Sequence, residues 1–363
     1  MDESIDINYV NKYLKKKFGE RTLKICIDGG FTCPNRDGFK SCEGCIFCSE
    51  RGSGEHLKSD FSIYDQVKNA FNSIKITRAN KFIIYFQNYT NTYDSIENLK
   101  RKYDEAINAF NTIAKKYNLE NNSKKELVGL QIATRPDCIN EEIAMLLSSY
   151  NKDLYVVVEL GLQTANEQTG KFINRCYTNN DFTNAVNLLN KYNIDIVAHI
   201  MIGLPSLENS STIESHEDLD NTIIFLNSHN IHGLKIHSTY VVKNTYLEKL
   251  YNEKKYIPMT LDYYLDELFY VLTHISQNVV IHRISGDAPK DLLVAPDWNL
   301  HKKWILNGIS KKIKRSNWPL YFYIWFVILD IARKILRLSI FSTPEISRHK
   351  ASYLIRLKNF LAS

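Results

Sequence analysis

Short apolar runs alternate with longer amphipathic segments along the first two thirds of the chain. Apolar runs rich in Val, Ile and aromatic residues are typical of buried strands, whereas apolar residues spaced three and four apart are typical of helices. The pattern predicts strands over 22–30, 81–87, 126–134, 155–163, 194–205 and 233–242. It predicts helices between them over 62–74, 95–117, 141–150, 181–192 and 219–228, with Ser95 as an N-cap.

This strict alternation of strands and helices predicts parallel βαβ units, so we expect an α/β protein. Six such units predict a partial or full barrel of the (β/α)6 type. Barrel enzymes place their chemistry at the carboxyl ends of the strands. Gln87, Arg135, Gln163 and Pro205 lie at these ends, and so does a cysteine-rich loop that follows the first strand.

The cysteine-rich loop reads CPNRDGFKSCEGCIFC and carries Cys33, Cys42, Cys45 and Cys48. The C-x-x-C spacing of the last two lets their thiolates bind one metal centre. Structural zinc takes four ligands, whereas a [4Fe–4S] cluster can be held by three thiolates with one iron left open. The loop alone is compatible with either metal, and inert buried thiols are the remaining interpretation.

The composition and the N-terminal sequence indicate in which cellular compartment the protein is found. The chain has 363 residues, of which 44% are hydrophobic, so it can bury a large core. Its N-terminus, MDESIDINYVNKYLKKKFGE, has no apolar segment of the kind that directs secretion, so we expect a cytoplasmic protein. Disulfides are rare there, and seven cysteines are an odd number, which favours metal binding over a disulfide framework.

Stretches of the cysteine loop and several stretches after it match one family of enzymes. The matching stretches read GFTCPNRDG, GCIFC, YFQNYTNTY, IATRPDC, VELGLQTANEQT, HIMIGLP, GLKIH and IHRISGDAP. Together they resemble the radical SAM enzymes of the Elongator-catalytic-subunit-like group, of the YhcC/YtqA type, from Tyr9 to Ile313. One departure lies at 174–177, where this chain reads NRCY and the group tends to read NRGH.

The resemblance implies a [4Fe–4S] cluster held by Cys33, Cys45 and Cys48, with Cys42 outside the ligand set. It also implies that S-adenosylmethionine binds the open iron and is cleaved to a 5′-deoxyadenosyl radical. The same resemblance implies an external electron donor of the flavodoxin or ferredoxin type.

Five polar side chains are candidates for holding S-adenosylmethionine, namely Gln87, Arg135, Glu159, Gln163 and His199. Glu159 lies within an apolar strand, where a carboxylate is costly to bury unless it is paired. Arg135 has a planar fork that suits a carboxylate or a phosphate. Gln87 begins a polar loop after a strand, which can also be an ordinary turn.

Three of these candidates have a further structural interpretation. Glu159 can form a buried salt bridge with Arg135 or Arg175. Arg135 can instead pair with Asp137, two residues later. A histidine inside a strand, such as His199, is usually satisfied by one hydrogen bond and has no direct role.

Positive charge is concentrated at the carboxyl end. Residues 302–363 carry 13 Lys and Arg against two acids, whereas the whole chain has a net charge of +6. A basic stripe with Trp304 and Trp318 suits a nucleic-acid backbone, and a solvated helical surface is the alternative. The resemblance points to tRNA, with a carboxymethyl-type substituent of the wobble uridine, or its precursor, as target. A small metabolite or peptide substrate, and a zinc-bound RNA-binding module, are the other hypotheses.

Within this tail, 318–341 is apolar and aromatic. Its uninterrupted run, Leu320–Leu329, is too short to cross a bilayer, so we expect no transmembrane span. We expect the segment to pack on the barrel or a partner, with contact at a membrane surface as the alternative. The sequence thus predicts a barrel domain over 1–313, with an iron–sulfur loop over 26–58, and a helical extension over 314–363. The segment after the family match is too short for an acetyltransferase domain, so we expect fragmentation or rearrangement of an existing substituent.

Overall fold

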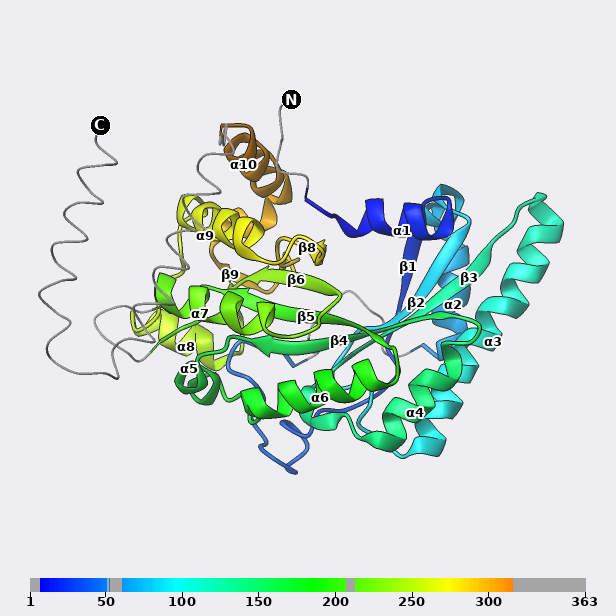
Figure 1. Cartoon of the computed structure of the whole chain (residues 1–363), viewed down its shortest axis with the longest axis horizontal. Coiled ribbons are helices and arrows are strands. Elements are labelled where there is room, and N and C mark those ends of the chain that lie inside the picture. Colours follow the sequence, from blue (N-terminus) through cyan, green and yellow to red (C-terminus); the bar gives the residue numbers. More distant parts are fainter. Residues whose placement is uncertain (1–6, 51, 53–60, 207–212, 316–363) are drawn as a thin grey trace, which may run out of the picture. The chain divides into compact units, whose positions relative to one another are not determined.

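The centre of the molecule is one seven-stranded sheet whose neighbouring strands all run parallel. The computed structural model describes residues 7–50, 52, 61–206 and 213–315. The strands lie across the sheet in chain order: β1 (Thr22–Ile27), β2 (Lys81–Phe86), β3 (Glu126–Thr134), β4 (Tyr155–Gln163), β5 (Asp195–Ile202), β6 (Gly233–Ser238) and β8 (Val280–Arg283). The sheet curls into a half-barrel (Figure 1), which confirms the expected α/β class and partial barrel.

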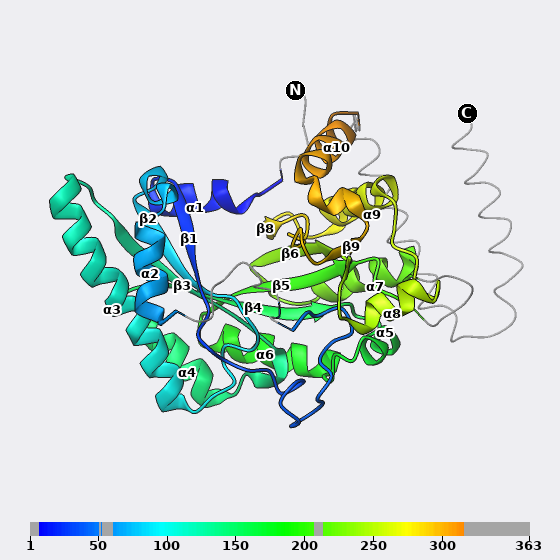
Figure 2. The same cartoon turned by 180° about the vertical axis from the view of Figure 1, so that it is seen from behind.

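Helices follow the strands, as parallel βαβ units require. The longer ones are α2 (Ile63–Phe71), α3 (Ile96–Asn121), α4 (Glu141–Tyr150), α6 (Asn179–Lys191), α7 (His216–Asn227) and α9 (Leu261–His274). Each begins after a Ser, Thr or Asn whose side chain accepts a backbone N–H, as predicted for Ser95. Figures 1 and 2 show α3, α4 and α6 along one side of the sheet. The shorter helices are α1 (Val10–Phe18), α5 (Glu167–Phe172), α8 (Tyr246–Asn252) and α10 (Lys302–Arg315).

Several strands differ from the sequence prediction. The strand expected over 22–30 ends at Ile27, and β9 (Leu293–Ala295) was not expected. The strand expected over 194–205 ends at Ile202, because Gly203 takes a left-handed φ of 80°. The strand expected over 233–242 is two strands: β6 ends at Ser238, and β7 (Val241–Val242) pairs antiparallel with β9 in a separate sheet. Strand β8 was missed, because four residues are too few to show a period.

Alternate residues of each strand face opposite sides of the sheet. On one side lie apolar side chains that are fully buried, such as Ile84 and Leu160. On the other side, Tyr85, Gln131 and Glu159 are buried as well, and their polar atoms bond one another. One face of the sheet therefore supplies the apolar core, and the other face carries the polar groups.

Residues 5–312 form one compact unit. A second unit includes residues 313–363, of which only 313–315 are described. The apolar segment 318–341 and almost all of the expected extension over 314–363 therefore lie outside the described residues. Within the described part of the chain, no helix is long and apolar enough to cross a membrane.

Candidate functional site

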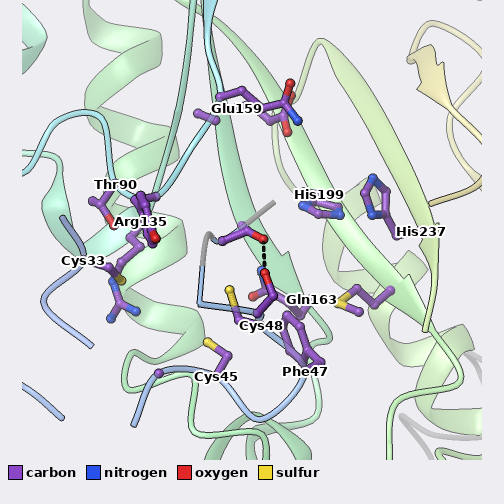
Figure 3. A pocket seen from close by; sticks show the side chains of 18 of the residues that line it. Cys33, Cys45, Phe47, Cys48, Thr90, Arg135, Glu159, Gln163, His199 and His237 are labelled. Carbon is purple, nitrogen blue, oxygen red and sulfur yellow. Dashed lines mark hydrogen bonds between the residues drawn. The ribbon is translucent and has the colours of Figure 1, made fainter. Parts of the chain in front are cut away.

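A pocket opens where the strands of the half-barrel end. Its lining comes from the loop after β1, from the ends of β2, β3 and β4, and from within β5, β6 and β8. We call one group of lining residues the cysteine wall: Cys33, Arg36, Cys45 and Cys48. We call another group the basic wall: His199, Lys235, His237 and Arg283. Figure 3 shows the cysteines on one side of the pocket and the two histidines on another.

The cysteine wall belongs to a loop that side chains hold in place. Asn35 is fully buried and donates to the carbonyl of Asn174 at 2.5 Å, and Asn174 donates to the carbonyl of Gly44 at 2.7 Å. Arg36 donates to the carbonyl of Cys48 at 2.7 Å. The loop is thus tied to the segment in which this chain departs from the family pattern.

Three thiols of this loop, Cys33, Cys45 and Cys48, line the pocket, whereas Cys42 is exposed. Across the described residues, no three His, Cys, Asp or Glu side chains are close enough to hold a metal ion as they stand. Burial, with Cys48 nearby, raises the pKa of Cys45 to about 12. The amide Nδ2 of Asn35 lies 3.6 Å from the sulfur of Cys45, so a polar N–H already faces that thiol.

The basic wall is assembled by the register of three adjacent strands. His199 of β5 is the partner of Lys235 of β6, and Lys235 is the partner of Arg283 of β8. His237 lies two residues after Lys235, on the same face, and its ring centre is 4.2 Å from that of His199. Strand pairing therefore brings four basic side chains together from three separate stretches of sequence.

Glu159 lies at the centre of a buried hydrogen-bond network. Its Oε1 accepts from Nζ of Lys235 at 2.5 Å, and its Oε2 accepts from the Tyr85 hydroxyl and from Nε2 of Gln131, both at 3.0 Å. Burial alone would raise the pKa of Glu159, but the Lys235 ammonium lowers that pKa below its usual range. The carboxylate is therefore charged and fully partnered.

Glu159 does form a buried salt bridge, but the predicted partners, Arg135 and Arg175, are wrong, because the partner is Lys235. Arg135 forms a two-pronged ion pair with Asp137, with both N···O distances 2.9 Å, as the alternative interpretation predicted. Arg175 is fully buried and donates to the carbonyls of Leu162 and Thr164 instead. The carboxylate of Glu159 therefore needed a cation from two strands away in the sheet, which no local pattern could reveal.

Both histidines of the basic wall are neutral. Burial and the charge of Lys235 lower the pKa of His199 to about 3. Burial and its neighbours His199, Lys235 and Arg283 lower the pKa of His237 well below its usual range. The Nε2 atom of His199 is buried and has no hydrogen-bond partner among the described residues. The single hydrogen bond expected for a structural histidine is therefore not found at this atom.

The pocket brings the predicted residues together. All five candidates for S-adenosylmethionine line it with the three cysteines, namely Gln87, Arg135, Glu159, Gln163 and His199. Gln163 ends β4 in a left-handed conformation, with φ of 62°, and its Oε1 accepts from the Tyr177 hydroxyl at 2.5 Å. Direct contact of these residues with the cofactor stays a prediction.

Sequence reasoning missed several residues that line the same pocket, chiefly Lys235, Arg283 and Tyr177. Lys235 and His237 alternate with apolar residues inside one strand, so a period-two search for polar residues would have found that pair. Arg283 could not be placed, because its strand was not predicted.

The half-barrel and its pocket define a class of protein: an enzyme of the barrel type with a cysteine loop at the carboxyl ends of its strands. The family model of the Radical SAM superfamily matches residues 33–219, and that of the Radical_SAM C-terminal domain matches residues 231–315. The chain belongs to the radical SAM superfamily.

Individual relatives agree with this assignment. The chain is similar to the uncharacterized protein YtqA of Bacillus subtilis, with 33% identity over 312 residues, covering 84% of this chain and 88% of that protein. It is similar to the tRNA uridine(34) acetyltransferase of Dehalococcoides mccartyi, with 33% identity over 132 residues, covering 36% of this chain and 27% of that protein. The archaeal Elp3 of Methanocaldococcus infernus shares the fold, with a TM-score of 0.59 and 18% identity, covering 80% of this chain and 63% of that one.

The superfamily uses a [4Fe–4S] cluster and S-adenosylmethionine, and the pocket fits both. Three thiols that line one cavity suit a cluster with one open iron, whereas structural zinc takes four ligands. The hydroxyl of Thr90 also lines the pocket, is buried, and has no hydrogen-bond partner among the described residues. A polar cofactor is the kind of ligand that would satisfy such an atom.

Proposed function

We propose that this protein is a radical SAM enzyme that modifies tRNA in the cytoplasm. The target is the carboxymethyl-type substituent of the wobble uridine, or its precursor. The observation that carries the proposal is the similarity to a tRNA uridine(34) acetyltransferase, because uridine 34 is the wobble position.

The charge of the last described helix supports a nucleic-acid partner. Over its described side chains, 302–314, helix α10 has five lysines and no acidic residue: Lys302, Lys303, Lys311, Lys312 and Lys314. Cations at this density bind the phosphate backbone of RNA without reading its sequence.

The chain's own residues position and shield the reaction. When bound, the cluster and S-adenosylmethionine supply a 5′-deoxyadenosyl radical, which takes a hydrogen atom from the substrate. Asn35 and Asn174 hold the loop that carries the thiols. Glu159 and its partners Tyr85, Gln131 and Lys235 are buried, so this end of the pocket is shielded from solvent. We expect an external electron donor of the flavodoxin or ferredoxin type.

The test uses protein reconstituted with iron and sulfide without oxygen. We expect release of 5′-deoxyadenosine to rise when bulk tRNA is added, and mass spectrometry of the digested tRNA to show a mass change in a wobble-uridine nucleoside. The Cys48→Ala variant is the control for cluster-independent release. Release that is indifferent to tRNA, with no changed nucleoside, would contradict the proposal and return a small metabolite or peptide as substrate.

A further inference from the structure

We propose that the basic wall, formed by His199, Lys235, His237 and Arg283, is the subsite that binds a carboxylate of the substrate. The inference rests on the proposed function, because a carboxymethyl-type substituent carries such a group. It also assigns His199 to the substrate rather than to S-adenosylmethionine.

The depth of the wall favours a small group over an RNA backbone. His199 and Lys235 each lie three residues before the end of their strand. Lys235 and His237 are only 7% and 9% exposed. A phosphodiester of folded tRNA stays at the mouth of such a pocket with its sugars, whereas a substituent on an extruded base can enter. The anion that fits this place is therefore a carboxylate on the base.

The interior of the half-barrel holds more cations than carboxylates. Glu159 is 2.5 Å from Lys235 and also interacts with Lys24, a second lysine inside the sheet. Burial and the charge of Lys235 together lower the pKa of Lys24 to about 8, although the carboxylate of Glu159 acts to raise it. One carboxylate thus serves two lysines, and positive charge in a buried place is costly until an anion balances it.

Carboxylates are also fewer than cations at the edge of the basic wall. Asp287 is shared between Arg283, at 3.2 Å, and Lys302, at 3.1 Å. One acid again serves two cations. The excess positive charge therefore lies on both sides of the two histidines.

The wall also offers hydrogen-bond donors. A neutral imidazole donates one N–H, and Nε2 of His199 is buried without a partner among the described residues. Arg283 presents a planar guanidinium, of which Nη1 lies 3.5 Å from Nε2 of His237. Guanidinium groups bind carboxylates with two parallel hydrogen bonds, so these donors suit the two oxygens of one carboxylate.

The carboxylate of S-adenosylmethionine does not compete for this place. In the superfamily that carboxylate binds the open iron, which the cysteine wall would hold. The two walls come from different elements, since the cysteines lie in the loop after β1 and the basic residues in β5, β6 and β8. Two anionic groups therefore have two separate places.

The first experiment needs no tRNA. The 19F line of trifluoroacetate is measured with the reconstituted holoenzyme, and trifluoroethanol serves as the neutral probe. We expect the trifluoroacetate line to broaden with the wild type and with the matched control Arg101→Gln, on the exposed face of α3. We expect the broadening to be lost in Arg283→Gln and partly kept in Arg283→Lys. Equal broadening of both probes, or equal lines in all variants, would overturn the proposal.

The second experiment uses two anticodon stem-loops that differ only at the wobble uridine, one with 5-carboxymethyluridine and one with its methyl ester. We expect wild type to prefer the acid by about 10- to 100-fold in Kd, the range of charge-assisted hydrogen bonds. Arg283→Gln should reduce that preference to about threefold or less. His199→Phe, which removes both ring nitrogens but no formal charge, should reduce that preference by a smaller factor, and it serves as the test if Arg283→Gln does not fold.

The outcomes separate the two proposals. Binding of trifluoroacetate with no change in any tRNA nucleoside would support the carboxylate subsite and contradict tRNA as the substrate. Modified tRNA with no preference for the acid and no binding of trifluoroacetate would keep tRNA and sink the subsite. The KM for S-adenosylmethionine is measured in Arg283→Gln as well. If the fold-increase in this KM exceeds the fold-decrease in the preference for the acid, the basic wall binds the cofactor and the proposal is overturned.

Discussion

The cysteine wall and the basic wall face one pocket but are built in opposite ways. The cysteine wall belongs to a loop, and side-chain bonds from Asn35, Arg36 and Asn174 fix its course. The basic wall stands on three adjacent strands, where backbone pairing fixes each side chain. The loop can adjust to a cofactor by moving a few side-chain contacts, whereas the strand residues are held in place by the whole sheet.

The difference also separates two kinds of chemistry. We expect the thiols to bind a cluster that arrives from outside, and metal binding itself organises such ligands. The buried charges of the basic wall are placed before any ligand arrives, which is how a protein selects a substrate group at low cost in reorganisation. Changes in the first wall should therefore remove the cofactor, and changes in the second should alter stability and substrate choice.

The largest effect is expected from the cysteines. Cys33→Ala, Cys45→Ala and Cys48→Ala should each abolish release of 5′-deoxyadenosine, because three thiolates are needed to hold the cluster. Cys42→Ala, at the exposed position, should leave both iron content and release at the wild-type level. Iron and sulfide analysis after reconstitution checks both. Loss of iron in the Cys42 variant would show that the ligand assignment is wrong.

The next effect is on stability and belongs to the basic wall. Glu159→Gln leaves the buried Lys235 without its carboxylate, so we expect a loss of about 3 kcal/mol in the free energy of unfolding at pH 6. Burial already lowers the pKa of Lys235, so the lysine can lose its proton and the loss should shrink toward pH 9. Urea titrations at the two pH values measure this.

The matched control is a glutamate of an exposed pair on the same sheet. Glu126 pairs with Lys81, and its side chain is 59% exposed. Glu126→Gln should cost less than about 1 kcal/mol at either pH, because solvent screens such pairs. Equal losses in the two variants would mean that the Glu159 network is no more than a surface-like pair.

A smaller effect is expected from the residue that holds the cysteine wall. Asn174 has a left-handed φ of 55°, and its side chain donates to the Gly44 carbonyl. Asn174→Ala should cost about 1–3 kcal/mol through strain and the lost bond, and lower the iron retained after gel filtration. Asn174→Gly relieves the strain but not the lost bond, so it should be the milder variant. Full retention of iron in both would remove Asn174 from the support of the loop.

The sequence predicts the cysteine wall better than it predicts the basic wall. The six longer strands and the cysteine loop were predicted because their signals are local: an apolar run, a cap or a C-x-x-C spacing. The partner of Glu159 was not, because Lys235 lies 76 residues away and is brought there by the curl of the sheet. Arg283 depends on a four-residue strand, which has no period to detect.

The smallest effect concerns pH. His199 stays neutral down to about pH 3 in the folded protein, whereas its usual pKa is 6.5, so the unfolded chain takes up the proton first as pH falls. Stability should therefore decrease as pH falls from 7 to 5.5, by about 1 kcal/mol for one such histidine. His199→Gln should lessen this dependence in thermal unfolding measured across that range. An unchanged slope would mean that His199 titrates alike in both states.

The most direct test of the central claim follows one hydrogen atom. Bulk tRNA from cells grown in deuterated medium is incubated with the reconstituted enzyme, and the 5′-deoxyadenosine formed is weighed by mass spectrometry. If the radical abstracts a hydrogen atom from tRNA, the 5′-deoxyadenosine carries one deuterium. The Cys48→Ala variant should form no 5′-deoxyadenosine. Formation of unlabelled 5′-deoxyadenosine from fully deuterated tRNA would contradict the account, because the hydrogen would then come from something other than the tRNA.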